Sequence, residues 1–186
     1  MSTSAPPLVI TVDDNLLLRE ITTADAPAIF KLIDSNRVYL RKWLPFVDYT
    51  RAVSDTESYI LGVTEAGNFS DLVFVILYRE QHVGVIGFKG VDLLNKKLEV
   101  GYWLAEAHQG KGIMIRCCKA VINYAFDKLD INRVQLKVAI GNEKSKSIPL
   151  KLGFKKEGVE RDGELGSMGV FYDLEVYSLL KREWQK

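Results

Sequence analysis

The chain of 186 residues is poor in the side chains on which metal sites and many hydrolases depend. Its two cysteines, Cys117 and Cys118, are adjacent, so they form neither a C-x-x-C metal knuckle nor a disulfide framework. Its two histidines, His82 and His108, exclude a three-histidine zinc site and leave few candidates for a Ser-His-Asp triad. We therefore expect no metal, a reducing and hence cytoplasmic location, and chemistry that uses other groups.

The sequence also lacks an excess of charge of one sign and any long apolar stretch. The 25 Lys and Arg residues against 24 Asp and Glu residues leave a formal net charge of +1, which supplies no strong field toward nucleic acid or an anionic membrane. The longest uninterrupted apolar run, residues 72–78, is far too short to span a bilayer, and residues 1–10 do not have the pattern of a signal peptide. We expect neither nucleic acid nor a membrane as a direct partner.

The size and patterning are those of one mixed α/β domain. With 47% hydrophobic and 26% charged residues, the chain is expected to form a single domain over residues 1–186, in which residues 1–12 are a loosely ordered extension. Alternating and apolar runs predict strands at 13–20, 72–79, 82–89, 97–104, 134–140, 154–165 and 171–180. Helical spacing and N-cap residues predict four helices. The first starts after Thr23 or Asp25, and the second runs from Ser54, which forms a capping box with Glu57, to about Ala66. The third covers 113–129, and the fourth runs from Asn142 to near Gly153.

One helix lies between two predicted strands and implies a parallel pair. The strand at 97–104 runs through a loop with Gly110 and Gly112 into the helix at 113–129, and the strand at 134–140 follows. A crossover of this kind joins parallel neighbours, whereas the short connections between 72 and 104 favour antiparallel pairing. The predicted fold class is α/β, with a mixed, mostly antiparallel sheet that contains a central parallel pair and is flanked by helices.

The glycine loop is the segment most suited to bind an anion. A helix that starts after a glycine turn presents free backbone N–H groups and the positive end of its dipole, and glycine lets the backbone approach a ligand closely. The letters Q-G-K-G lack the order of a P-loop. Taken alone, the segment is equally consistent with a tight turn before a core helix.

Two motifs make the chain resemble the GNAT superfamily of N-acetyltransferases. The Q/R-x-x-G-x-G/A pattern of that family falls on Gln109, Gly112 and Met114, with Met in place of the last Gly or Ala. Its second motif, an Asn followed by a small residue three positions later and a helix ending in Gly-Phe, falls on NEKSKSIPLKLGF, with Asn142 and Ser145 in the matching places. The two motifs together, in this order and separated by a strand, are far more specific than either one.

Within that superfamily the chain is most similar to the RimJ/RimL branch, the ribosomal-protein N-terminal acetyltransferases. The resemblance covers roughly residues 15–184 and rests on LRKWLPF, GYWLAEAHQGKGI, NEKSKSIPLKLGF, RDGEL and YDLEVYSLLKREW. It implies that the central parallel strands splay apart and that acetyl-CoA wedges between them. The cofactor-binding residues that it implies are Tyr102, Trp103, Leu104, Gln109, Gly110, Lys111, Gly112, Ile113, Met114, Asn142 and Ser145.

The resemblance also suggests the catalytic groups. Many GNAT enzymes carry a Tyr acid seven residues after the Asn, but this position is Pro149 here. By similarity to RimL-like enzymes, Ser145 is assigned as the acid that protonates the leaving thiolate and Glu164 as the base that acts through water. Each also fits a structural role, Ser145 in the first turn of a surface helix and Glu164 on a solvated strand.

Other side chains leave similar alternatives open. Trp43 and Phe46 are expected either to line a substrate groove or to pack in the core, and Lys111 and Arg116 either to meet CoA phosphates or to stay solvated. His108 is more consistent with polar surface than with substrate binding, and the two cysteines with the core.

The resemblance implies an acetyl-CoA-dependent N-acetyltransferase whose acceptor is an amine, foremost the N-terminal α-amino group of a protein, including a ribosomal protein. Two alternatives remain: a non-catalytic acyl-CoA-binding module, and an enzyme that acetylates a small amine such as a polyamine, an amino acid or an antibiotic. The acceptor, the acyl-chain preference and the existence of a homo-oligomer stay open.

Overall fold

The computed structural model describes residues 6–64 and 71–184, except the side chain of Met168. The strands are β1 (Val9–Asp13), β2 (Leu16–Glu20), β3 (Leu72–Tyr78), β4 (Gln81–Asp92), β5 (Lys97–Leu104), β6 (Arg133–Ala139), β7 (Lys155–Leu165) and β8 (Phe171–Leu180). The α-helices are α1 (Ala26–Ser35), α2 (Arg37–Leu40), α3 (Val53–Thr64), α4 (Ile113–Asp127) and α5 (Glu143–Lys151). The predicted mixed α/β class is confirmed.

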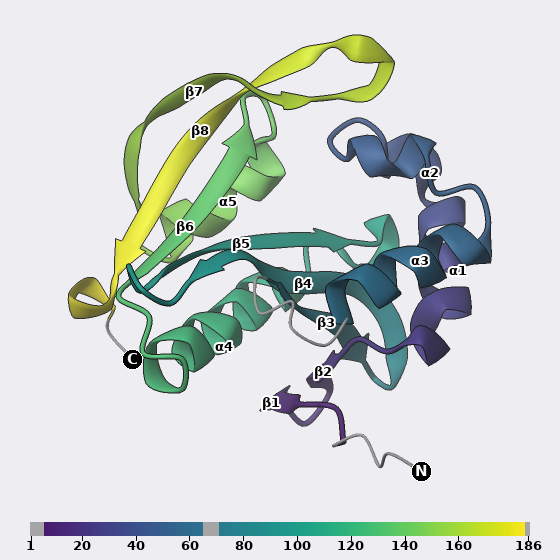
Figure 1. Cartoon of the computed structure of the whole chain (residues 1–186), viewed down its shortest axis with the longest axis horizontal. Helices are drawn as coiled ribbons and strands as arrows, with labels where there is room; N and C mark the ends of the chain where they lie inside the picture. The colour runs from purple at the N-terminus through teal and green to yellow at the C-terminus, as the bar shows by residue number, and fades with distance from the viewer. Residues whose placement is uncertain (1–5, 65–70, 185–186) are drawn as a thin grey trace.

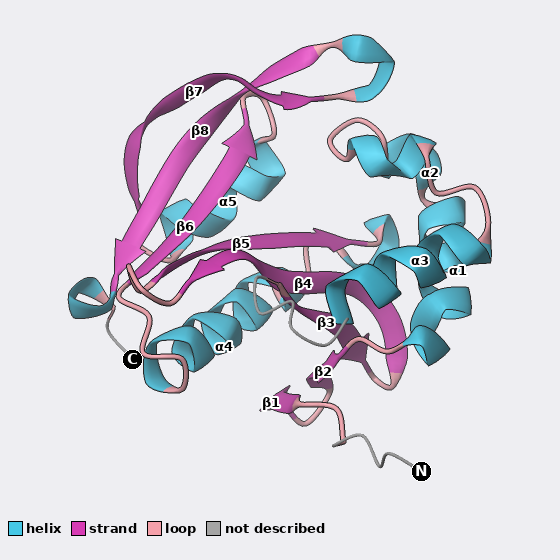
Figure 2. Cartoon of the chain, in the orientation of Figure 1, coloured by secondary structure: helices cyan, strands magenta, loops and turns pink. Residues whose placement is uncertain are grey.

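All eight strands form one sheet in the order β1-β2-β3-β4-β5-β6-β8-β7. Every neighbouring pair is antiparallel except β5 and β6, which are parallel and joined through α4, as the crossover predicted. Helix α4 covers one face of the β1–β5 part of the sheet, and α1 and α3 cover the other (Figure 1). Strands β6, β8 and β7 form a second, tilted wing (Figure 2).

The central parallel pair separates soon after it begins. Strands β5 and β6 are in register only from Lys97 opposite Arg133 to Glu99 opposite Gln135. Beyond these positions β5 continues to Leu104 and β6 to Ala139, and Figure 1 shows them diverging. The splay implied by the family resemblance is therefore present.

Alternation along the strands places the core on both faces of the sheet. In β3, Phe74 and Ile76 pack on the α4 side, whereas Val73 and Val75 pack with α1 and α3. Cys117 and Cys118 are fully buried on the inner face of α4, which confirms their predicted core position. Among the described residues no helix is both long and apolar enough to cross a membrane.

Some local predictions were wrong. The expected strand at 13–20 is present only as Leu16–Glu20. Asp13 ends the preceding strand β1, and its carboxylate accepts a hydrogen bond from the Asn15 N–H at 2.9 Å in the turn that leads into β2. Residues 9–12 therefore belong to the sheet and not to a loose extension.

The start of α3 also differs from the prediction. The helix begins at Val53, so Ser54 lies inside it instead of capping it with Glu57. The Asp55 carboxylate reaches back to the N–H groups of Arg51 (2.7 Å) and Ala52 (2.8 Å). Residues 65–66, the predicted end of this helix, lie outside the described residues.

Candidate active site

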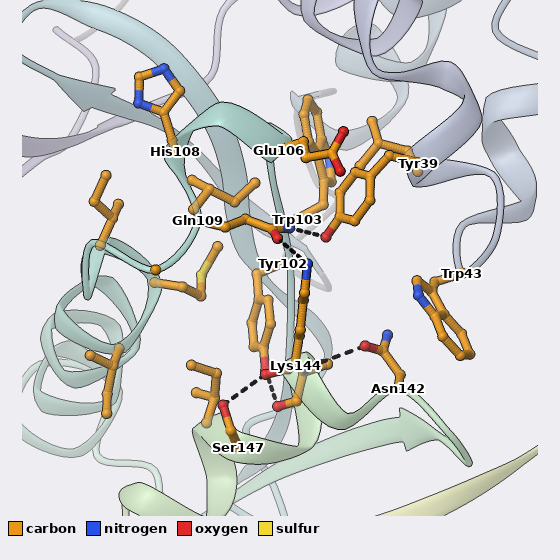
Figure 3. A pocket seen from close by; sticks show the side chains of 18 of the residues that line it. Tyr39, Trp43, Tyr102, Trp103, Glu106, His108, Gln109, Asn142, Lys144 and Ser147 are labelled. Carbon is orange, nitrogen blue, oxygen red and sulfur yellow. Dashed lines mark hydrogen bonds between the residues drawn. The ribbon is translucent and has the colours of Figure 1, made fainter.

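A cleft of about 660 Å³, called the cofactor cleft below, opens where β5 and β6 diverge (Figure 3). Its walls come from the second half of β5, the start of α4 and the helix α5, with Tyr39 and Trp43 on the opposite side. The predicted cofactor residues that line it are Tyr102, Trp103, Leu104, Gln109, Gly110, Gly112, Ile113, Met114, Asn142 and Ser145. Lys111 does not line the cleft and is exposed.

The glycine loop has the conformation that an anion site at a helix start requires. Gly110 and Gly112 have φ angles of +73° and +67°, and Gly112 is the N-cap of α4. Apart from the adjacent residues of the chain, no atom of the described residues lies within 4 Å of the position that a Cβ would occupy at either glycine, so the left-handed backbone and not crowding favours glycine. The N–H groups of the first turn of α4 have no partner within the helix and face this loop.

Three side chains form a polar bridge across the mouth of the cofactor cleft. The ammonium of Lys144 donates to Gln109 Oε1 at 2.8 Å, and Gln109 Nε2 donates to the Tyr39 hydroxyl (Figure 3). The bridge connects α5, the glycine loop and α2, which are far apart in the sequence.

Asn142 and Ser145 are placed by the capping of α5. Asn142 Oδ1 accepts a hydrogen bond from the Ser145 N–H at 3.2 Å, as the sequence predicted for an N-cap. Because this bond uses the amide oxygen, the Asn142 NH₂ group remains as a donor toward the cleft.

A tyrosine from β5 stands beside the predicted acid. The Tyr102 hydroxyl lies 3.2 Å from Ser145 Oγ and donates to the Ser145 carbonyl oxygen at 3.3 Å. Burial raises the pKa of Tyr102 far above its ordinary value, so the phenol keeps its proton. The sequence predicted Tyr102 only as a cofactor contact, because the contact with Ser145 joins positions 43 residues apart.

A second cavity, also about 660 Å³, lies on the other side of β5. Its floor is formed by β4, β5 and β6, and its walls by the segment 43–50, α1, α3 and β7. The residues that line both this second cavity and the cofactor cleft are Trp43, Leu44, Tyr102, Trp103, Asn142 and Ser145. The two spaces therefore meet at Tyr102 and Ser145.

Glu164 lies in the second cavity and not in the cofactor cleft. Burial raises its pKa, the Lys89 ammonium lowers it and the Glu99 carboxylate raises it, with a net upward shift. Glu99, on β5, lines the same cavity at 3.9 Å from the Lys137 ammonium. Sequence reasoning missed Glu99 as a site residue, although alternation already placed it opposite the face of Leu98 and Val100.

The second cavity is bridged on its outer side by the tip of the β7–β8 hairpin. Ser167 Oγ donates to the Arg41 carbonyl at 3.0 Å, and the Tyr172 hydroxyl donates to the Lys42 carbonyl at 3.3 Å. The rings of Tyr172 and Trp43 are 6.2 Å apart. These contacts join the hairpin tip to the segment after α2.

The remaining candidates are also placed. Phe46, 38% exposed, lines the second cavity with Trp43, in agreement with the groove alternative. Arg116 forms an ion pair with Asp13 and does not line the cofactor cleft. His108 lines the cleft, but its ring packs edge-on against Tyr78.

Comparisons with known proteins agree with this geometry. A family model described as an acetyltransferase (GNAT) domain matches residues 15–155. The chain is 38% identical over 177 residues to the putative ribosomal N-acetyltransferase YdaF of Bacillus subtilis (strain 168), which covers 94% of this chain and 96% of that protein. It is 28% identical over 157 residues to the ribosomal-protein-serine acetyltransferase of Escherichia coli (strain K12), with 83% and 87% coverage.

A solved structure of RimL, described as a ribosomal L7/L12 alpha-N-protein acetyltransferase in complex with coenzyme A, matches with a TM-score of 0.87 at 26% identity. The match covers 93% of this chain and 98% of that one. The similarity to the RimJ/RimL branch predicted from the motifs is confirmed by these names. With the family model over most of its length and a splayed sheet that opens a cleft at the glycine loop, the chain belongs to the GNAT acetyltransferase family.

Proposed function

We propose that the protein transfers the acetyl group of acetyl-CoA to the α-amino group of a protein N-terminus, with ribosomal proteins as the first candidates. The observation that carries this proposal is the meeting of two cavities at Tyr102 and Ser145. One cavity suits a CoA thioester and the other suits an amine, and the two groups would meet at the lining residues that both cavities share. The names of the relatives support the ribosomal candidates.

The cofactor cleft offers a different contact to each part of CoA. The N–H groups at the start of α4 suit the pyrophosphate, since a helix N-terminus stabilises negative charge. The edge of β5 beyond Glu99 is not paired with β6, so its backbone groups are available to the amides of the pantetheine arm. The Asn142 NH₂ group supplies one further donor.

The chemistry requires a neutral amine, and this favours an α-amino group. An α-amino group has a pKa of about 7.7 to 8.0, whereas that of a lysine is about 10.4. At about 1.36 kcal/mol per pKa unit, deprotonating a lysine side chain costs roughly 3.5 kcal/mol more. A site whose proposed base is a single carboxylate suits the amine that is easier to deprotonate.

Glu164 acts as the base in this proposal. It lines the second cavity from β7, and its raised pKa makes it a stronger base than a solvated glutamate. Glu164 takes the proton of the acceptor ammonium through a water molecule, and the neutral nitrogen attacks the thioester carbonyl. Glu99 shares the cavity, but its carboxylate lies 3.9 Å from the Lys137 ammonium, whereas no cation forms an ion pair with Glu164 among the described residues.

Ser145 acts as the acid. As the carbon–sulfur bond breaks, Ser145 Oγ gives its proton to the thiolate and takes in its place the second proton that the nitrogen loses as it becomes an amide, while the Tyr102 phenol keeps its own proton. Tyr102 also fixes the position of Ser145 through the bond to the Ser145 carbonyl. The products are the acetylated amine and free CoA.

Thiol release and intact mass spectrometry with matched acceptors test the proposal. Peptides with a free Ser or Ala N-terminus should gain one acetyl group, whereas the same peptides with a blocked N-terminus and one internal lysine should react far more slowly. Spermidine serves as the small-amine comparison. Acetylation of spermidine alone would favour the small-molecule alternative. CoA binding without turnover of any acceptor would favour the binding module.

Binding of the cofactor is measured separately. Acetyl-CoA or CoA in excess, with EDTA present, should raise the melting temperature, because a ligand that binds only the native state stabilises it. An unchanged melting temperature at saturating CoA would contradict the assignment of the cofactor cleft.

A further inference from the structure

One lysine of β4 extends over the floor of the second cavity. Lys89 is directly opposite Glu99 in the β4–β5 register, but its side chain leans along β5 and lies over Gly101. A Cβ built on Gly101 would be 2.8 Å from Lys89 Cε and 3.4 Å from Lys89 Nζ. The missing side chain at Gly101 thus makes room for the end of Lys89 on the floor of the second cavity.

The other charges of this cavity leave Lys89 without an ion-pair partner. Lys137 is held by Glu160 at 2.8 Å and lies 3.9 Å from Glu99. The Asp71 carboxylate accepts a hydrogen bond from the Gly90 N–H at 3.3 Å. Within residues 6–64 and 71–184, no carboxylate forms an ion pair with Lys89, and no cation forms one with Glu164.

We infer that the second cavity selects an acceptor that carries a carboxylate close to its reactive amine, and that Lys89 binds this carboxylate. This inference rests on the proposed function. The acceptor amine faces Glu164 and Ser145, and its carboxylate faces the Lys89 ammonium. Lys89 and Glu164 attract each other across the cavity but form no salt bridge among the described residues, so each gains a direct partner. A protein N-terminus with Asp or Glu at its second residue has this chemistry, and so does a free amino acid.

The position of Lys89 explains why it acts on specificity. Its ammonium is exposed to the open cavity, so it costs little to leave unpaired before the acceptor binds. The Lys89 ammonium also disfavours an acceptor with a second positive charge near the amine, because two positive charges in the same cavity repel each other. Lys89 is therefore a specificity-determining residue and takes no proton in the reaction.

Three peptides that differ only at the second residue test this inference: Ser-Asp, Ser-Asn and Ser-Lys followed by the same uncharged sequence. For the wild type we expect kcat/KM to fall about threefold to tenfold from Asp to Asn, and further for Lys. In Lys89→Gln the three peptides should have similar kcat/KM values, and the affinity for CoA should not change. Lys119→Gln, an exposed lysine on α4, is the matched control and should keep it.

Gly101→Ala provides a second variant that keeps the charge. The added Cβ displaces the flexible end of Lys89 from the floor, so the preference for Asp should shrink although the lysine is present. Serine and ethanolamine are compared as small acceptors, because ethanolamine has the same amine and hydroxyl groups but lacks the carboxylate. This comparison tests whether a free amino acid, and not only a peptide, can supply the carboxylate that Lys89 binds. A preference for serine over ethanolamine that Lys89→Gln abolishes would support recognition of a free amino acid.

Equal kcat/KM for the three peptides in the wild type would overturn the inference while leaving N-terminal acetylation in place. A preference for Asp that persists in Lys89→Gln would overturn the role of Lys89. If the wild type acetylates neither the peptides nor serine, both the inference and the proposed function are wrong.

Discussion

Replacing Gly112 by Asp is expected to separate cofactor binding from folding. Gly112 is the N-cap of α4, and no atom lies within 4 Å of the position of a Cβ there, so an aspartate side chain has space. Its φ of +67° is strained for most residues but is tolerated by Asp and Asn. A carboxylate at a helix N-terminus also stabilises the helix by about 0.3 to 1 kcal/mol, so the unliganded variant should fold.

The loss of affinity follows from the charge that the carboxylate meets. At a separation of about 6 Å and an effective dielectric constant between about 20 and 80, each phosphate charge of CoA repels it by about 0.7 to 3 kcal/mol. Two such charges give about 1.4 to 6 kcal/mol, so CoA should bind at least about tenfold more weakly. Because the repulsion is electrostatic, added salt should reduce it.

Calorimetric titration with CoA measures the effect, and Gly112→Asn is the matched control. Asn has the shape of Asp and the same tolerance of a positive φ, so the difference between the two variants isolates the charge. Melting curves without CoA establish that both variants are folded. A folded Gly112→Asp variant with wild-type affinity would refute the placement of the pyrophosphate at the start of α4. An equal loss in Gly112→Asn would refute the electrostatic cause and show that the added side chain itself blocks CoA.

Three further predictions concern catalysis and stability. Ser145→Ala and Glu164→Gln should each lower kcat by about 100-fold to 10,000-fold, and the affinity for acetyl-CoA should not change. A higher pH supplies neutral amine from solution, so it should partly restore the activity of Glu164→Gln but not that of Ser145→Ala. Parallel pH profiles of the two variants would contradict their separate roles. Tyr102→Phe should lower kcat by about twofold to tenfold through the lost hydrogen bond to Ser145, and steady-state kinetics with an unchanged kcat would show that the phenol is dispensable.

The third concerns Asp25, whose side chain is 4% exposed. Burial raises the pKa of Asp25, but bonds from Arg19, His82 and Thr22 lower it more, to about 2 from 3.8. Asp25 has a lower pKa in the folded protein than in the unfolded chain, so its ionised form stabilises the fold. This contributes about 2 kcal/mol to the free energy of unfolding at a pH above the unfolded pKa, and the contribution is lost as the pH falls from about 4 toward 2. Asp25→Asn should therefore melt earlier at neutral pH and approach the wild type near pH 2, and a melting difference that does not depend on pH would contradict this.

The elements predicted well from the sequence are those whose pattern is local and strong. The strands β3, β4 and β5 follow from their apolar runs, and α4 and α5 follow from a glycine turn and an Asn cap, both of which lie where they were expected. The cofactor cleft was predictable for the same reason, because most of its lining comes from two short motifs. The hairpin at Asp13 was missed because its first strand, β1, lies almost wholly within residues 1–12, which were expected to form a loose extension.

The second cavity was mostly not predictable, since it depends on contacts between distant segments. Ser167 meets Arg41 across 126 residues of sequence, and Tyr172 meets Lys42 across 130. The position of Lys89 depends on the absence of a side chain at Gly101 on the next strand. No spacing within a single segment encodes such contacts, because they arise only when the sheet is assembled.

The early separation of β5 and β6 gives the sheet two edges inside the molecule, in addition to the outer edges at β1 and β7. Exposed strand edges recruit further strands and are a common route to aggregation. Here the open part of the β5 edge lies in the cofactor cleft with the glycine loop and α5, and the end of β6 lies in the second cavity. The fold thereby converts a feature that is hazardous on an outer surface into the wall of a cleft, where free backbone groups suit an extended, amide-bearing molecule.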